Sequence, residues 1–471
     1  MKNGKLYELL KSFSGHDYLR AEKFLASPFF NEDTNLLRMI RYFHELHDKR
    51  EEFPADKEEL YRKIFSEEDN YDEKMFRYRL SSLSMLLEDF ISVKFLQQDS
   101  VQWNVIRQKA IFARSCNKSF EYVSALIGKE LSRAYKDKDS LLQSYMSNLN
   151  LLEFQASRSG RASGLPFREA LISLDKFYLS SKLKLSAEFI NAGNVLSEEN
   201  NVLLLDEARK AAAFDEFREE PSIAVYSAVV DLLLSVESTD EFERFYSLLK
   251  TNIQFFSPHE RLELYHYLKN FCIRMINTGR QEFLSVLFSI YKMNLSDIKI
   301  FRDEFLSPWE YKNIVTLGLR QGEHEWVHDF IHGYRKFIEP NQQENAYLYN
   351  LGNWYFHQGR HSEMLKIFQQ VEFTDLFYQL DTRSLLLKTY YETGEDEQLL
   401  YHASAFRVFL SRNKQVSSYQ RKVYRNFISY TVKLFRSGTS KDKLIKLLDE
   451  VRSVRQIADL RWLEKKITEL L

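Results

Sequence analysis

Glycine, proline and cysteine are all scarce in this sequence. Its 471 residues include 14 glycines, 7 prolines and 2 cysteines. Glycine and proline supply the tight turns between strands, so their scarcity argues against a β-rich fold and favours long helices with brief connections. The cysteines, Cys116 and Cys272, stand in apolar, helical-looking sequence. We expect both to be small buried hydrophobic residues rather than disulfide partners or reactive thiols.

Excess charge of one sign and long apolar segments are also missing. The chain has 66 basic and 67 acidic residues, a net charge of −1, so no global field attracts nucleic acid or an anionic membrane. No segment approaches the ~18 uncharged apolar residues of a membrane span. The N-terminus lacks the apolar core of a signal peptide. We therefore expect a cytoplasmic protein that does not enter a membrane, and for which nucleic acid is a disfavoured partner.

Apolar and aromatic side chains at helical spacing are abundant. Hydrophobic residues make up 44% of the chain and aromatic residues 15%. The spacing predicts an all-α protein in four parts. These are an N-terminal helical module at 1–100, long connecting helices at 101–155, a flexible linker at 156–166, and helical repeats at 167–471 that end in a capping helix.

Five glycines mark the repeat. Each follows one apolar helix and precedes another, at separations of 43, 37, 35 and 44 residues: Gly279, Gly322, Gly359, Gly394 and Gly438. The residues eight and four positions before each glycine, and nine after it, are apolar, aromatic or small. The two upstream offsets lie within about 40° of each other on a helix. One face of the first helix is therefore expected to pack against the second helix, with the glycine in the turn.

This pattern resembles the tetratricopeptide repeat. The closest copy has the leucine-glycine pair, tyrosine, turn glycine and later aromatic residue of that family, although a methionine replaces its usual small residue: Leu348, Leu351, Gly352, Tyr355, Gly359, Met364 and Phe368. The resemblance covers about residues 265 to 455. It implies a right-handed α-α superhelix, an α-solenoid, whose first helices line a concave groove that binds peptides.

Asparagines and lysines recur on a second face of the first helices. Nine residues before the glycine, three successive repeats have asparagine, and lysines stand beside or near them on the same face: Lys269, Asn270, Lys312, Asn313, Asn350, Asn353 and Lys388. These offsets point away from the packed face, so we expect an open surface. The resemblance implies peptide binding there. Carboxamides can hydrogen-bond an extended backbone, and lysines favour an acidic or carboxylate-bearing partner. An ordinary solvated helix face is the alternative.

One short motif points to catalysis instead. His324 and His328 stand at i and i+4, a spacing that can share a zinc ion, and Glu325 could act as general base. His332 adds a third imidazole one turn later. However, the motif begins directly after a repeat turn, charged residues flank it, and no strand is expected beside it. We favour a solvated histidine face without a cofactor, and keep a zinc-dependent hydrolase as an alternative.

A basic helix face in the N-terminal module offers a third alternative. The helix expected from about Asp72 to Leu96 has Lys74, Arg77 and Arg79 close together. This cluster suits a solvated surface better than a nucleic-acid contact, because the chain as a whole is neutral. The function that we favour is therefore a non-catalytic scaffold or adaptor that binds an extended peptide or a partner helix in the groove.

Overall fold

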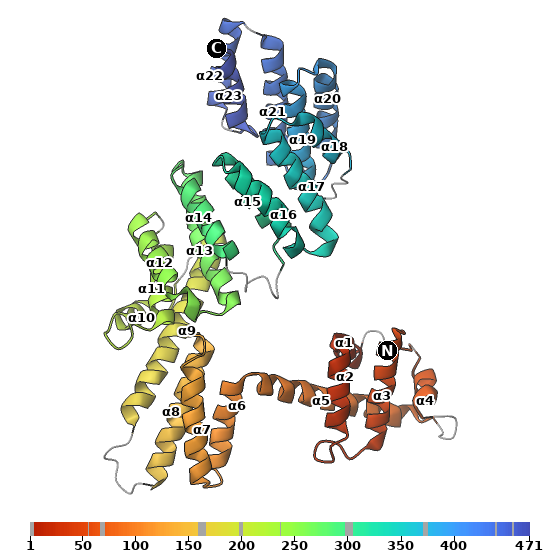
Figure 1. Ribbon diagram of the computed structural model, residues 1–471, viewed down its shortest axis with the longest axis vertical. Helices are drawn as coiled ribbons and strands as arrows, with labels where there is room; N and C mark the ends of the chain where they lie inside the picture. Colours follow the sequence, from red (N-terminus) through yellow and green to blue (C-terminus); the bar gives the residue numbers. More distant parts are fainter. Residues whose placement is uncertain are drawn as a thin grey trace. The chain divides into compact units, whose positions relative to one another are not determined.

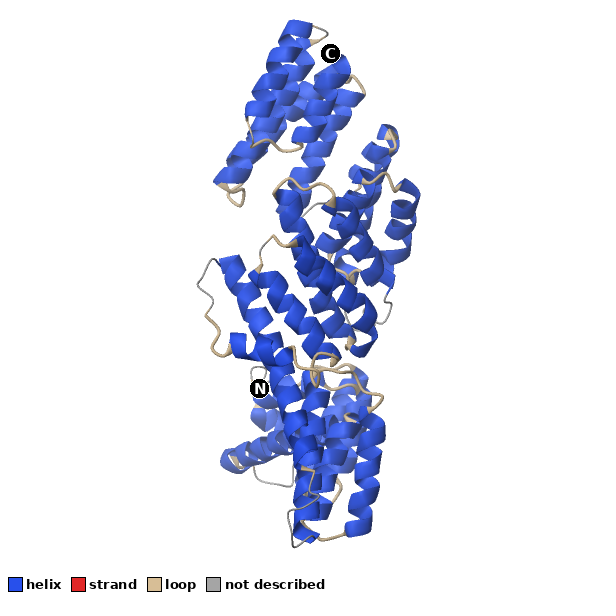
Figure 2. Ribbon diagram, turned by 90° about the vertical axis from the view of Figure 1, so that its left-hand side faces the viewer, coloured by secondary structure: helices blue, strands red, loops and turns tan. Residues whose placement is uncertain are grey.

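The computed structural model describes residues 4–54, 56–65, 71–158, 166–196, 201–235, 237–296, 305–370, 375–438, 440–454 and 456–471. Within these ranges the regular structure is helical and contains no strand (Figure 2), which confirms the all-α prediction. No helix in the described ranges is long and apolar enough to cross a membrane. The chain forms two compact units, Met1–Val236 with Lys250–Phe256, and Glu237–Leu249 with Ser257–Leu471.

The first unit begins with a short-helix module and continues into longer helices (Figure 1). Its described helices are α1 (Lys5–Ser12), α2 (Gly15–Leu25), α3 (Thr34–Lys49), α4 (Lys57–Phe65), α5 (Glu73–Gln98), α6 (Ser100–Phe112), α7 (Asn117–Leu131), α8 (Lys138–Arg158), α9 (Phe167–Leu196), α10 (Leu205–Ala212) and α11 (Pro221–Leu234). The helix expected from Asp72 is α5, and the Asp72 side chain accepts hydrogen bonds from the first backbone amides of that helix.

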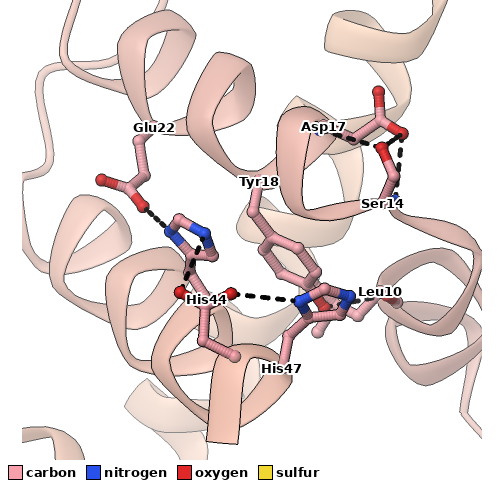
Figure 3. A network of polar contacts seen from close by, with 8 residues as sticks. Leu10, Ser14, Asp17, Tyr18, Glu22, His44 and His47 are labelled. Carbon is pink, nitrogen blue, oxygen red and sulfur yellow. Dashed lines mark hydrogen bonds and ion pairs between the residues drawn. The ribbon is translucent and has the colours of Figure 1, made fainter. Parts of the chain in front are cut away.

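A buried tyrosine ties the first three helices together (Figure 3). Tyr18 on α2 is fully buried and donates a hydrogen bond of 2.8 Å from its hydroxyl to the carbonyl oxygen of Leu10. Its ring stacks on His44 of α3, with 5.3 Å between the ring centroids. His44 Nδ1 lies 2.5 Å from a carboxylate oxygen of Glu22. The phenol therefore caps the end of α1 inside the apolar core that α1–α5 share.

The expected linker at 156–166 lies between α8 and α9, and residues 159–165 of it are outside the described residues. Helices α8 and α9 pack against each other, so the first unit continues across this segment.

The two cysteines have different surroundings. Cys272 is fully buried on α13 (Pro258–Asn277) as expected, and burial raises the pKa of its thiol to about 12. The expectation is wrong for Cys116, which is exposed. Cys116 precedes the first residue of α7, so it lies outside the helical turns that pack against neighbours.

The second unit is a series of helical hairpins. Its described helices are α12 (Thr239–Asn252, with its last residues in the first unit), α13, α14 (Phe283–Ser296), α15 (Pro308–Arg320), α16 (His324–Tyr334), α17 (Pro340–His357), α18 (His361–Phe368), α19 (Leu376–Glu392), α20 (Asp396–Arg412), α21 (Ser418–Ser437), α22 (Lys441–Ser453) and α23 (Leu460–Leu470). Proline at the first position starts α13, α15 and α17, and serine side chains cap α13 and α15.

The five glycines occupy the hairpin turns. All five have positive φ angles, between 55° and 103°, a region that side chains disfavour. None of the residues at the three predicted offsets is exposed, and all five that follow the glycine by nine positions are buried. The packing is closest at Gly352, where a Cβ atom would lie 2.2 Å from Phe368 Cε1. The predicted hairpins, with glycine in each turn, are therefore confirmed.

The last helix covers the end of the series. Leu463 and Ile467 of α23 are fully buried in the core that α19 to α23 share. The helix spans Leu460–Leu470.

Candidate functional site

A groove of about 1430 Å³ runs along the second unit. Its walls come mainly from α15, α17 and α19, the first helices of three successive hairpins, together with α21 and α23. Both polar and aromatic side chains line it. This groove is the candidate site.

The groove residues follow a strict register. In the hairpins of Gly322, Gly359 and Gly394, the residues ten, six and two positions before the glycine all line the groove: Lys312, Thr316, Arg320, Tyr349, Asn353, His357, Ser384, Lys388 and Glu392. Residues four apart lie on one side of a helix, so each first helix presents one stripe of its surface. The same stripe is used in three consecutive hairpins.

Asn353 and Lys388 are buried, which contradicts their predicted exposure. With Lys312 they are the three of the seven predicted ligand-binding residues that line the groove. The asparagine position itself does not. Asn350 is fully buried, and its side-chain amide donates a hydrogen bond of 2.8 Å to the carbonyl oxygen of Ala346 in the same helix. Asn350 directly follows the groove residue Tyr349, so its side chain points about 100° away from the groove stripe. That side of α17 is covered, because α17 packs against both α15 and α19. The predicted exposure of Asn350 is therefore wrong.

The remaining predicted residues lie outside the groove. Asn270 and Asn313 are exposed, but neither lines the groove. Lys269 is buried, with its ammonium 2.5 Å from a carboxylate oxygen of Glu310 and 5.3 Å from the ring centroid of Tyr291. Lys269 therefore joins α13 to α15 instead of facing a ligand.

Lys312 forms part of a charged and aromatic cluster in the groove wall. Its ammonium pairs with Asp381 of α19 and lies 5.2–5.5 Å from the ring centroids of Trp309, Tyr349 and Tyr378. Tyr424 of α21 donates a hydrogen bond of 3.2 Å to the other oxygen of Asp381. Three helices, α15, α19 and α21, are joined through this one carboxylate.

Lys388 forms a second cluster further along the groove. Its ammonium lies 2.9 Å from an Asp459 oxygen and 5.2 Å from the Phe356 ring centroid. Asp459 directly precedes α23 and has a left-handed φ of 48°. Burial opposes ionisation of Asp459, but the Lys388 ammonium and then Arg320 outweigh it, so the pKa of Asp459 is lowered.

His357 lies beside this second cluster. Withdrawal from bulk water in the groove and then the charge of Lys388 lower the pKa of its imidazole to about 4. The ring is therefore neutral near pH 7. It still reaches solvent through the groove opening.

A third ion pair closes the far end of the groove. Lys466 of α23 lies 2.7 Å from a Glu392 oxygen, and Trp462 Nε1 donates a hydrogen bond of 3.0 Å to the other oxygen. The lysines predicted to attract an acidic partner are thus already paired with carboxylates of the same chain.

Cationic residues nevertheless remain in excess. Six cationic and three anionic residues line the groove, a difference of three: Lys312, Arg320, Lys388, Arg461, Lys465 and Lys466 against Asp381, Glu392 and Asp459. Arg320 is exposed and makes no hydrogen bond or ion pair with the other described residues. Arg461 donates a hydrogen bond to Gln281, and Lys465 lies 3.7 Å from Glu469. Arg320 is thus the cation most available to a ligand.

The histidines of the zinc motif do not converge with other ligands. The rings of His328 and His332 lie 4.3 Å apart, and His332 Nδ1 is 2.9 Å from the carbonyl oxygen of His328. Among the described residues, no group of three or more His, Cys, Asp or Glu side chains is arranged to hold a metal ion. His324 contributes its carbonyl oxygen to a hydrogen bond of 2.9 Å from Trp354 Nε1.

The basic face of α5 is partly paired within the first unit. Arg77 lies 2.7 Å from a Glu73 oxygen. Arg79 lies 3.9 Å from Asp33 and 5.3 Å from the ring centroid of Phe65. These contacts leave Lys74 as the cation of this face without an ion pair among the described residues.

Most of the residues that line the groove were not predicted from the sequence. Thr316, Arg320 and His357 follow from the four-residue spacing once the stripe through Lys312 or Asn353 is chosen. Asp459 and Lys466 had no local signal, because they reach the groove from a helix about seventy residues away in the chain.

Comparisons of this chain with models of protein families, with curated proteins and with solved structures find no significant match.

Proposed function

We propose that this protein is a non-catalytic scaffold or adaptor that binds an extended segment of a partner protein in the groove of its second unit. The observation that supports this most is the shared register, by which three consecutive hairpins present the same stripe to one groove. In this proposal the hairpins form a right-handed superhelix of the tetratricopeptide type, with the stripe on its concave side. The protein would work in the cytoplasm.

The chemistry of the groove favours an acidic partner. Thr316 supplies a hydrogen-bonding group for a peptide backbone, and Phe356 supplies apolar surface. The excess of cations attracts negative charge and speeds the encounter with an acidic segment.

Arg320 has the main role in this proposal. The paired lysines cannot bind a partner carboxylate without giving up Asp381 or Asp459. Arg320 makes no direct ion pair with the described residues, although its charge acts on Asp459, and its guanidinium can bind a carboxylate through two parallel hydrogen bonds. Lys465, whose own ion pair is exposed, supplies a second positive charge at the α23 wall.

Affinity purification followed by mass spectrometry tests the proposal. The wild-type chain is compared with a groove variant, Arg320→Glu with Lys465→Glu, and with a control that makes the same charge change on exposed lysines of second helices, Lys366→Glu with Lys443→Glu. We expect the groove variant to lose at least one partner that the wild type and the control both retain. If the groove variant keeps every partner, the groove is not the binding site.

A further inference from the structure

Helix α9 in the first unit exposes an apolar stripe that Ser181 and Lys182 interrupt between Tyr178 and Leu185. Large apolar side chains along one side of it are 37–59% exposed: Phe167, Leu171, Leu174, Tyr178, Leu185 and Phe189. Its opposite side is buried, because α8 and α11 pack against it. In Figure 1 this helix, drawn in yellow, has α8 along one side. An amphipathic surface helix normally turns polar residues to solvent, so this face is unusual for a protein that acts alone.

The spacing of the stripe is that of a coiled-coil seam. The apolar residues from 167 to 178 follow one another by four, three and four positions, and Leu185 stands seven after Tyr178. From 167 to 185 this is the alternation of a heptad repeat, in which every first and fourth residue faces a partner helix, with Ser181 at the remaining position. The next seam position is Glu188, and Phe189 lies beside the seam. The helix has 30 residues and is therefore about 45 Å long, enough for four heptads.

We propose that α9 pairs with α9 of a second copy of this chain in an antiparallel coiled coil, which makes the protein a homodimer. This proposal does not depend on the groove of the second unit.

One antiparallel register matches the sizes of the side chains. With the two-fold axis between residues 179 and 180, Leu174 of each copy faces Leu185 of the other. Tyr178 then faces Ser181 and Phe167 faces the exposed Ala192, so that two large side chains each meet a small one, while Leu171 faces the exposed Glu188. Such alternation of large and small residues is what a tightly packed helix pair requires.

The charges beside the stripe fit the same register. Asp175 and Lys182 lie seven residues apart, on the same flank of the stripe. In the antiparallel pair each Asp175 faces Lys182 of the other copy, twice across the interface. Neither side chain makes an ion pair with the described residues of its own chain. A parallel pair would not bring these two residues together, so the charges favour the antiparallel arrangement.

The area of the stripe is sufficient for a stable dimer. Six large apolar side chains, each about half exposed, offer on the order of 100 Å² apiece. Two copies would then bury roughly 1,200 Å², the lower end of the range for specific protein interfaces.

The test measures the mass of the purified full chain by light scattering and by sedimentation at micromolar concentrations. We expect twice the mass of one chain. Leu174→Glu with Leu185→Glu should give the mass of a single chain, whereas Leu19→Glu with Leu400→Glu, the same change on exposed leucines of other helices, should leave the dimer intact. Circular dichroism checks that each variant keeps its helices. A monomeric wild type, or a dimer that survives the α9 substitutions, overturns the proposal.

A charge swap tests the antiparallel register. Asp175→Lys alone sets a lysine opposite Lys182 of the other copy, twice across the interface. Lys182→Asp alone sets an aspartate opposite Asp175 of the other copy, also twice. Each single substitution should raise the dissociation constant of the dimer severalfold, and the double substitution should restore the wild-type value. If the double variant dissociates at least as readily as the worse single variant, this register is wrong.

Discussion

The groove of the second unit and the outer face of α9 in the first unit expose opposite kinds of side chain. The groove stripe presents Lys312, Thr316 and Arg320, whereas the α9 stripe presents Leu171, Leu185 and Phe189. Polar surface is stable in water without a partner, and an apolar stripe gains free energy when it is covered. The polar groove suits the proposed charge-guided, reversible binding, and the apolar stripe suits the proposed lasting association.

Two helical glycines, one from each unit, differ in how closely neighbouring side chains approach them, and this difference gives the largest expected effect. At Gly352 of α17 a Cβ atom would lie 2.2 Å from the ring of Phe368, whereas Gly128 of α7 has nothing within 4 Å. Gly352→Ala should lower the free energy of unfolding by about 1–3 kcal/mol, because the packed hairpin must move apart. Gly128→Ala should raise it by about 0.5–1 kcal/mol, because alanine favours the helix.

Urea unfolding followed by circular dichroism measures both substitutions. The same chemical change is therefore expected to have opposite signs at Gly352 and Gly128. Equal effects at the two glycines would contradict the close packing of α17 on α18.

Salt should separate the two proposed interfaces. Raising NaCl from about 50 mM to about 500 mM shortens the distance over which charges act, so the amount of partner captured through the groove should fall by about tenfold. The mass of the α9 dimer should not change, because apolar burial does not weaken with added salt. Pull-down and light scattering on the same protein sample measure the two responses. Loss of the dimer at high salt would show that charge, and not the apolar stripe, holds it.

A smaller effect is expected from His357 in the groove. Its pKa is lowered from the ordinary value of 6.5 to about 4, so the unfolded state binds more protons than the folded state between these values. The stability that this difference contributes is complete above about pH 6.5 and is lost as the pH falls toward about 4. His357→Gln should therefore flatten the dependence of unfolding free energy on pH in this window. If the variant keeps the wild-type slope of unfolding free energy against pH, groups other than His357 determine that slope.

Much of the fold could be predicted because its signals are local. The period of a helix fixes which residues share a face, and a left-handed turn favours glycine, so Gly322 and Gly394 could be placed in hairpin turns from the sequence. The apolar residues at the three core offsets could be predicted for the same reason. The site was only partly predictable. Lys312 and Lys388 were placed on the open face, but their ion pairs with Asp381 and Asp459 were not expected.

The sequence by itself determined the helices, the turns and the seam within each hairpin, since these depend on residues close together in the chain. Only the tertiary structure decided which of the remaining faces stays open. It buried Asn350 between neighbouring helices and left Arg320 facing the groove. Both outcomes depend on how one hairpin stacks on the next, and Lys312 meets Asp381 across 69 residues of sequence. Contacts over such distances come from the packing of whole helices, which no local pattern encodes.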